Sequence, residues 1–330
     1  MTFVDVITGL LNGPKANAAF LLRSALAPPW ALRVQDEAPL TLVAVVRGTA
    51  WVLPEAGQAT LLSAGDVAIL RGPDPYVFAD DPDTAPQAFI HPGQRCTTPE
   101  GQELASLGGL DVRTWGNDPD GGTELLTGTY QVLGEVCRPL LDALPTLAVV
   151  RREDTHTPFV ALLAEEITRE QPGQEAVLDR LLDLLLIATL RTWFTRPGAQ
   201  SPGWYHAHSD PIVGAALKLL HDDPAHPWTV AALAAETHVS RACLARRFTA
   251  LVGQPPMAYL ANWRLALSAD LLCHPGETIG SVAEKVGYGS SFALSAAFKR
   301  VRGISPRQHR DHAARHRPPI ATTNQWRPTR

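Results

Sequence analysis

The chain has 330 residues, of which 45% are hydrophobic, and its formal net charge is -4. This length allows two domains with sizeable cores, and the composition is ordinary for globular proteins. No apolar run reaches the roughly 18 residues of a membrane span, and the start of the chain lacks the basic and apolar regions of a signal peptide. A cytoplasmic protein with no membrane contact is therefore expected.

The net charge conceals an acidic part and a basic part of the chain. Residues 226–330 contain 14 Lys and Arg against 5 Asp and Glu, whereas residues 1–225 contain 15 against 28. A basic region joined to an acidic body is typical of a protein that brings one region to a polyanion. Charge alone does not name the polyanion, and a solvated basic face is the alternative.

Short apolar runs between residues 30 and 90, separated by Gly and Pro, predict short antiparallel strands. Turns are expected at residues 47–48, 55–57 and 64–66. Residues 92–122 are loop-like, and one further strand is expected at Glu124–Tyr130. These patterns predict an all-β sandwich or barrel of about eight strands.

From Pro158 onward the apolar residues recur at helical spacing, which predicts two helices separated by residues 171–173. The second helix is apolar on more than one side, at Leu181, Leu182, Leu184, Leu185 and Leu186. Such a helix packs between the strands and a neighbour, or it forms a dimer contact, and both interpretations remain open.

Residues 196–211 contain three prolines and two glycines and are predicted to be an interdomain linker. Trp204, His206, His208 and Asp210 in this segment could be drawn as a metal site. No further ligand follows at a suitable spacing, so a polar linker is the favoured interpretation.

The basic part of the chain contains a repeat. The segment from Thr229 to Tyr259 resembles the segment from Thr278 to His309. Each copy has a short apolar stripe, a turn and a second helix that begins after a serine, Ser240 or Ser290. A short helix, a tight turn and a capped second helix predict a helix-turn-helix in each copy.

The apolar residues of each second helix predict which face is buried: Leu244, Phe248 and Leu251 in the first copy, and Leu294, Phe298 and Val301 in the second. The opposite faces, with Thr249 among them, are predicted to point toward DNA. With the capping serines and the adjacent basic residues, the predicted DNA-binding residues are Ser240, Arg241, Ala242, Ala245, Arg246, Arg247, Ser290, Ser291, Phe292, Ser295, Ala296, Lys299 and Arg300.

Arginine chemistry suggests roles within this set. Arg241 and Arg246 are candidates for bidentate contacts with guanine, whereas Arg247, Lys299, Arg300 and also Arg302 are expected to hold phosphates. A long amphipathic helix is predicted from the sequence that joins the two copies, PPMAYLANWRLALSADLLCHPGE. Such a helix would fix the two reading helices relative to each other, and a separation of about 34 Å would suit successive major grooves.

At this point a family resemblance can be stated. Residues from about 210 to 310 resemble the DNA-binding domain of the AraC/XylS family of regulators, through the patterns SRxxLxRRF, GxxPxxYLxxWRLxxA, VAxxVGYGS and AFKRxxGxSPxxxR. The combination is highly specific. The second reading helix departs from the family pattern at Ser291, Leu294 and Ala296, where the family often has an acidic residue, an aromatic residue and an arginine. The first helix-turn-helix is therefore expected to carry more of the base readout, while the second mainly holds phosphates or touches thymine methyl groups through Phe292.

Residues from about 5 to 147 resemble the cupin-like sensor domain of some regulators of this family, through LTLVAVVRGTAWVL and ATLLSAGDVAILRGPDPYVF. Metal-binding cupins have histidines where this chain has Thr41, Ala44 and Tyr76, and His91 alone does not restore a site. Neither a metal nor another cofactor is expected.

Together these resemblances imply an α+β multidomain fold: a cupin-like antiparallel β-barrel with following helices, then an all-α domain with two helix-turn-helix units. The expected parts are a sensor domain at 1–150, a helical dimerisation or packing segment at 151–196, a linker at 197–210, the DNA-binding domain at 211–312 and a mobile tail at 313–330.

The implied function is transcription regulation rather than catalysis. Promoter DNA is the expected partner, together with a small effector, RNA polymerase and a second copy of the chain as a homodimer. Four aromatic residues of the sensor domain line an effector pocket or, more simply, fill its core: Trp30, Trp51, Tyr76 and Phe78.

Three further functions remain as alternatives at this stage. The four cysteines, Cys96, Cys137, Cys243 and Cys273, contain no CxxC pair and fit neither a disulfide scaffold nor a zinc cluster. Cys96 and Cys137 could nevertheless sense oxidants if their thiols were exposed. A cupin enzyme tethered to DNA would need a histidine and carboxylate cluster, and no such spacing is found. An RNA-binding or structural protein would show no preference for one duplex sequence.

Overall fold

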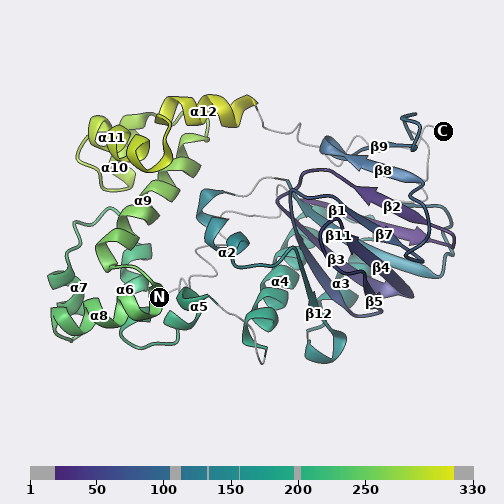
Figure 1. Ribbon diagram of the computed structural model, residues 1–330, viewed down its shortest axis with the longest axis horizontal. Helices are drawn as coiled ribbons and strands as arrows, with labels where there is room; N and C mark the ends of the chain where they lie inside the picture. The colour runs from purple at the N-terminus through teal and green to yellow at the C-terminus, as the bar shows by residue number, and fades with distance from the viewer. Residues whose placement is uncertain (1–18, 105–112, 132–133, 156, 197–201, 316–330) are drawn as a thin grey trace. The chain divides into compact units, whose positions relative to one another are not determined.

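The computed structural model describes residues 19–104, 113–131, 134–155, 157–196 and 202–315 (Figure 1). The chain divides into two compact units. One unit holds the strands and the helices at 157–196. The other holds the described residues of Gln200–Arg317 together with Gly134–Ala143, a short segment that the chain inserts from between two strands. The predicted tail, residues 313–330, lies mostly outside the described residues, which end at residue 315.

Two six-stranded sheets form the first unit (Figure 1). Most neighbouring strands are antiparallel, but β1 and β10, and β2 and β8, pair in parallel. In the order of the first sheet, its strands are β10 (Thr114–Gly116), β1 (Ala19–Leu26), β11 (Thr123–Tyr130), β3 (Leu40–Arg47), β6 (Val67–Arg71) and β12 (Leu147–Val150). Those of the second are β5 (Thr60–Ser63), β4 (Thr49–Pro54), β7 (Tyr76–Ala79), β2 (Ala31–Val34), β8 (Ala88–His91) and β9 (Arg95–Thr97).

The core of this unit lies between the two sheets. Val43 and Leu125 of the first sheet and Val52 and Phe78 of the second belong to one buried apolar cluster. Along β4 buried side chains alternate with more exposed ones, as expected for a strand with one face on a core. The expected turns are confirmed, and at Gly48 the backbone φ is +74° and a Cβ atom would meet the carbonyl oxygen of Gly122.

The prediction of a closed β-barrel is wrong in one respect, because the strands form two separate sheets. A sandwich buries the same alternating apolar faces without a closed ring of hydrogen bonds, so the sequence pattern does not distinguish the two. The loop expected at 92–122 contains β9 and β10, and β1 was not predicted. Within β1 a charged residue, Arg23, is tolerated because its Nε lies 2.7 Å from Glu124 on the neighbouring strand.

Two helices follow the strands, α3 (Phe159–Glu166) and α4 (Gln174–Thr195). Leu182 of α4 lies against Gly128 of β11, where a Cβ atom would come within 2.5 Å of the leucine side chain. One apolar side of α4 therefore packs on the first sheet, which was one of the two interpretations that the sequence left open. A second apolar side stays open, because Val177 and Leu184 are 45% and 43% exposed.

The second unit is helical. Besides η3 (Glu135–Cys137) and α2 (Arg138–Asp142), it contains α5 (Gly203–Ala207), α6 (Val213–Asp222), α7 (Val230–Glu236), α8 (Arg241–Val252), α9 (Pro256–Leu272), α10 (Ile279–Lys285), α11 (Ser291–Arg302) and α12 (Pro306–Arg315). Helix α5 lies in the segment predicted to be a linker. No helix in the described part of the chain is long and apolar enough to cross a membrane.

A buried carboxylate fastens one end of the sandwich. Asp66 accepts hydrogen bonds from the backbone N–H groups of Ser63 and Arg152 at 3.0 and 2.9 Å and from the Arg151 guanidinium at 2.7 Å. Asp66→Ala should lower the free energy of unfolding by about 2–4 kcal/mol, because three donors lose a buried acceptor. Chemical denaturation would measure this. Asp74→Ala, at an exposed position, is the control, and equal midpoints for the two variants would contradict the assignment.

A half-buried histidine, His221, joins α6 to α9. The Nε2 atom of His221 lies 2.7 Å from the hydroxyl of Tyr259, and its ring stacks on Trp263 with centroids 4.1 Å apart. Burial, helped by the nearby His208, lowers the pKa of His221 to about 3. An unfolded histidine has a pKa of about 6.5.

The stabilising contribution of the neutral ring is therefore complete above about pH 6.5 and is lost as the pH falls toward 3, because only the unfolded chain takes up the proton. Between pH 7 and 5 this loss should amount to about 2 kcal/mol in the free energy of unfolding. His221→Gln should remove that part of the pH dependence in denaturation curves. Parallel pH profiles for the two proteins would show that the ring titrates normally when folded.

Candidate nucleic-acid interface

The first helix-turn-helix consists of α7 and α8, joined by residues 237–240. Thr229 caps α7 by accepting a hydrogen bond from the N–H of Ala232 at 3.0 Å, and Ser240 caps α8 by accepting from Cys243 at 3.2 Å. His238 makes the tight turn with a positive φ of +53°. The predicted position of the turn and the predicted serine cap are both confirmed.

The second helix-turn-helix repeats this construction with α10 and α11. Thr278 and Ser281 form a reciprocal capping box at the start of α10, and Ser290 caps α11 by accepting from Ala293 at 3.1 Å. Gly287 in the turn has a φ of +81°, and a Cβ atom there would lie 2.6 Å from the carbonyl oxygen of Ala225. Both the backbone conformation and the close approach require glycine at this position.

The buried faces of the two reading helices agree with the prediction except at one residue. Leu244 and Phe248 of α8, and Leu294 and Phe298 of α11, are fully buried. Val301, predicted to face inward, is instead 54% exposed. At the equivalent position of the first helix-turn-helix, Leu251 is half-buried, and Gly203 at the start of α5 lies against its backbone.

The opposite faces are open to solvent. Most of the predicted DNA-binding side chains are exposed, and only Ala245 and Ser295 are half-buried: the exposed ones are Ser240, Arg241, Ala242, Arg246, Arg247, Ser290, Ser291, Phe292, Ala296, Lys299 and Arg300. Phe292, in the first turn of α11, is 83% exposed.

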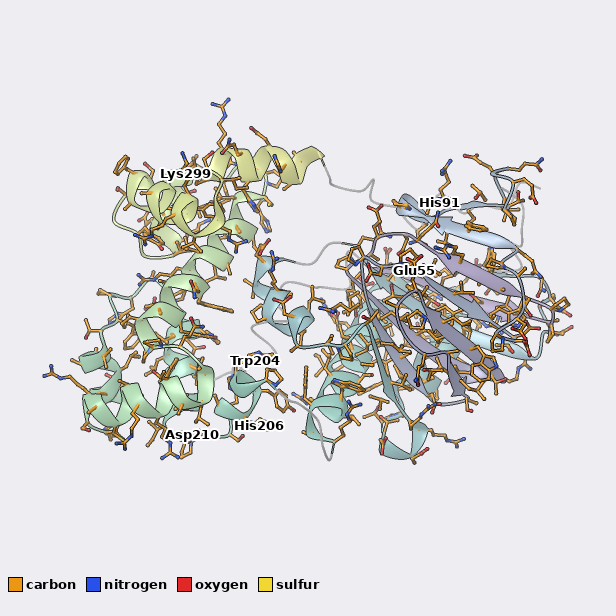
Figure 2. All side chains as sticks on the ribbon, in the orientation of Figure 1. Glu55, His91, Trp204, His206, Asp210 and Lys299 are labelled. Carbon is orange, nitrogen blue, oxygen red and sulfur yellow. The ribbon has the colours of Figure 1, made fainter. Side chains whose placement is uncertain are left out.

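Charge partners separate the basic residues into two classes. Arg247 is paired with Asp210, with its Nε and Nη2 atoms 2.7 and 2.6 Å from the same carboxylate oxygen. Figure 2 labels Asp210. Arg302, at the end of α11, lies 2.6 Å from Glu135. By contrast, Arg241, Arg246, Lys299 and Arg300 form no ion pair with any described residue. These four are the cations that the helices present without an internal partner.

Asp210 has a structural role besides this ion pair. Its carboxylate accepts hydrogen bonds from the N–H groups of Ile212 and Val213 at the start of α6. Partial burial opposes ionisation, but these bonds and Arg247 outweigh it and lower the pKa of Asp210. The same residue was one of four in a hypothetical metal site with Trp204, His206 and His208. Among the described residues no three His, Cys, Asp or Glu side chains come together as a metal site would require.

Helix α9 connects the two helix-turn-helix motifs, as predicted. Leu260 near its start belongs to the core of the first helix-turn-helix, whereas Leu265, Ala269 and Leu272 belong to the core of the second. Its 17 residues span about 25 Å. Arg264 on this helix donates to the carbonyl oxygens of Pro224 and His226 at 2.6 and 2.8 Å, which fixes the loop before α7.

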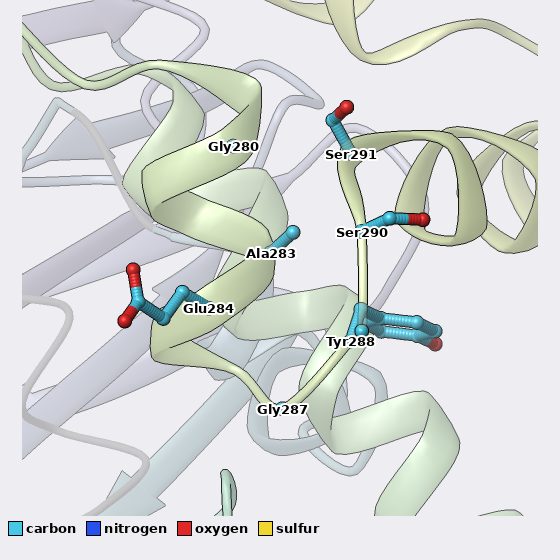
Figure 3. Close-up of a pocket in the computed structure, with 8 residues that line it drawn as sticks. Gly280, Ala283, Glu284, Gly287, Tyr288, Ser290 and Ser291 are labelled. Atoms are coloured by element: carbon cyan, nitrogen blue, oxygen red, sulfur yellow. The ribbon is translucent and has the colours of Figure 1, made fainter.

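A shallow recess lies beside the start of the second reading helix (Figure 3). It is lined by the turn Gly287–Ser291 together with Gly280, Ala283 and Glu284. Figure 3 shows the Glu284 carboxylate directed away from Ser290 and Tyr288. The recess therefore exposes small residues and two serine hydroxyls where the N-terminal half of α11 begins.

The N-terminal unit contains two other candidate sites, the aromatic residues of a possible effector pocket and the cysteines Cys96 and Cys137. Trp30, Tyr76 and Phe78 are buried core residues, and Trp51 is half-buried. Burial raises the pKa of the Cys96 thiol to about 11, so this side chain is protonated at neutral pH. A protonated thiol is a poor nucleophile toward oxidants, and Cys137 is fully buried. These two environments disfavour the redox hypothesis.

Comparisons with known proteins match both parts of the chain. A cupin family model matches residues 5–195, and a helix-turn-helix domain model matches residues 233–312. A putative AraC-like transcription regulator of Streptomyces lividans is 35% identical over 288 residues, which is 86% of this chain and 90% of that protein. The regulator AlkR of Acinetobacter baylyi is 35% identical over 184 residues, covering 53% of this chain and 59% of its own length.

Among solved structures, the DNA-binding domain of AdpA in complex with a target DNA is 30% identical and matches 33% of this chain and 96% of its own, with a TM-score of 0.31. The cupin match covers more than half of the chain, and the Streptomyces relative is matched over nearly its full length. The chain therefore belongs to the family of AraC-like transcription regulators.

Proposed function

We propose that this protein regulates transcription by placing α8 and α11 in the major groove of a specific double-stranded DNA sequence. The observation that carries the proposal is the pair of serine-capped helices whose outward faces hold four exposed cations without internal partners. Each helix is buried through leucine and phenylalanine on one side only. The width of the major groove, about 12 Å, admits such a helix.

The two helix-turn-helix motifs present different side-chain chemistry to DNA. Helix α8 presents Arg241 and Arg246, whose guanidinium groups can bind guanine through two hydrogen bonds. Helix α11 presents Phe292 and Ala296, which cannot donate hydrogen bonds, beside Lys299 and Arg300. We assign base readout chiefly to α8, and phosphate contacts with apolar contact to thymine methyl groups chiefly to α11.

The internal partner of Arg247 bears on its predicted role. A guanidinium already paired with Asp210 must give up or share that carboxylate before it binds a phosphate. We therefore rank Arg247 below Arg241 and Arg246 as a DNA contact. The expected phosphate contact of Arg302 is weakened for the same reason by Glu135.

The remaining parts of the proposal concern the whole chain. We propose a cytoplasmic protein without catalytic activity, in which the sensor domain at 1–150 and the helices at 151–196 precede the segment 197–210, the DNA-binding domain at 211–312 and the tail at 313–330. A small effector bound by the sensor domain, and RNA polymerase as a further partner, stay predictions.

A second copy of the chain is the partner that the open side of α4 fits best. Val177, Leu181, Leu184 and Ala188 follow one another at spacings of four, three and four residues. This is the spacing at which two helices interlock along a shared seam. Leu162 of the neighbouring α3 is 42% exposed and adds to the apolar surface. We propose that this face forms a homodimer.

Arginine and lysine variants test the assignment of readout. Arg246→Ala should weaken binding to the preferred duplex by about 1–3 kcal/mol and relax the preference at one base pair. Lys299→Ala should weaken binding to preferred and random duplexes alike. Selection from a random duplex library, followed by titration at fixed salt, measures both effects. Arg180→Ala, on α4, changes the net charge equally and serves as the control. Equal losses on both duplexes for Arg246→Ala would contradict base readout.

A charged residue on the open side of α4 tests the dimer. Leu184→Glu should weaken self-association at least tenfold, because two buried carboxylates would face each other across the seam. Sedimentation equilibrium over a range of protein concentrations measures the dissociation constant. Leu61→Glu replaces a leucine of similar exposure on β5 and should leave association unchanged. A monomeric wild-type protein would end this proposal without affecting the one on DNA binding.

A further inference from the structure

A short segment of the chain, residues 134–143, packs on the DNA-binding helices although it is inserted between two strands of the N-terminal unit. Strand β11 ends at Tyr130 and β12 begins at Leu147, yet the segment belongs to the same compact unit as α5–α12. Only residues 131–133 and 144–146 separate it from the strands on either side. The segment is thus joined to a strand of the sandwich by three residues on each side.

A half-buried carboxylate accepts hydrogen bonds from the start of this segment. Asp270, in the last turns of α9, accepts hydrogen bonds from the backbone N–H groups of Glu135 and Val136 at 2.6 and 3.2 Å. Burial raises the pKa of Asp270, and the two hydrogen bonds act in the opposite direction. These N–H groups form the open end of a short helical turn, and a carboxylate is the natural acceptor for them.

Two further contacts extend the attachment. Val136 is buried against Trp263 of α9, with Trp204 of α5 and Tyr259 packed around them. Glu135 forms the 2.6 Å ion pair with Arg302, the last residue of the second reading helix. The segment thus contacts α9 through a hydrogen-bonded and an apolar contact, and α11 through an ion pair. It braces the end of α11 against the connector.

The sequence is adapted to this contact at Gly134. Its φ and ψ, -68° and 161°, are accessible to any residue, so the backbone does not require glycine. A Cβ atom at this position would instead lie 2.4 Å from a carboxylate oxygen of Asp270. Because that carboxylate accepts hydrogen bonds from two N–H groups of the segment, moving it aside would stretch the bonds that dock the segment.

We propose that residues 134–143 are the coupling element between the two parts of the protein: docking of the segment on α9 and Arg302 braces the two reading helices, so that docking and DNA binding favour each other. The proposal rests on the DNA-binding function proposed above. A change at the ends of β11 and β12, whatever its origin, would then reach the reading helices through this segment. Such coupling is reciprocal, so DNA must stabilise the docked segment as much as docking strengthens DNA binding.

The direct test is hydrogen exchange at the amides of Glu135 and Val136 in the full-length protein, with and without the duplex that the wild type selects. Bound duplex should slow their exchange about fivefold or more, the lower range of measured couplings. Faster exchange with DNA would mean that docking opposes binding, and unchanged exchange would mean that the two are independent. Either result overturns the proposal.

Gly134→Ala tests the same coupling from the other side. It should speed the exchange of both amides and weaken affinity for the selected duplex by a similar factor. Gly122→Ala is the matched control, because a Cβ atom there meets nothing within 4 Å and the residue is exposed. Faster exchange at unchanged affinity would overturn the proposal.

Exchanging the two charges of the ion pair distinguishes loss of docking from general unfolding of a variant. Glu135→Arg and Arg302→Glu should each weaken docking and DNA binding, and the two changes together should restore docking, which a general loss of stability would not do. Absence of rescue in the exchange rates would contradict the ion pair as part of the brace. If the wild type selects no duplex, the proposed function fails, while the exchange rates of Gly134→Ala still report on docking.

Discussion

The arrangement of the DNA-binding helices depends on one constraint: a single helix, α9, is buried at one end in the core of the first helix-turn-helix and at the other end in the core of the second. Leu260 and Leu272 lie twelve residues apart and belong to different apolar clusters. A helix of this length transmits orientation because its backbone hydrogen bonds resist bending. The separation of the reading helices is thus a property of α9 and not of a flexible linker.

Electrostatics then divides the work among the basic residues. The number of arginines in the DNA-binding part overstates the number of cations available to contact DNA. Arg247 and Arg302 form ion pairs with carboxylates, and Arg264 donates hydrogen bonds to backbone carbonyl groups. The cations without partners fall on α8 and α11 beside small side chains, where a close approach to a duplex is sterically open. The charge asymmetry of the sequence is therefore a correct indication of the polyanion-binding part, but it does not distinguish contact residues from structural ones.

The parts that the sequence predicts well are those encoded locally. A serine cap, a tight turn and an apolar stripe lie within twenty residues of one another, so both helix-turn-helix units and the connector could be placed from the sequence. The errors concern long-range packing. Arg23 sits in a strand only because Glu124 pairs with it from a hundred residues away. Val301 follows the buried spacing but is exposed, since the periodicity of a helix does not show where its neighbours end. Sheet closure is likewise decided by strand pairing, which alternation alone does not specify.

The same reasoning explains why residues 134–143 escaped prediction. Their sequence, GEVCRPLLDA, contains no signal for DNA binding, and their importance comes from Asp270, which lies more than 130 residues later in the chain. An acidic residue near the end of a helix is unfavourable in itself, because the carboxyl end carries partial negative charge. Its presence there is understandable once the two amide groups that it accepts are included. Departures from local rules of this kind occur where distant parts of a chain are held together, and in this protein the departure coincides with the place where the chain passes from the sandwich to the helices and back.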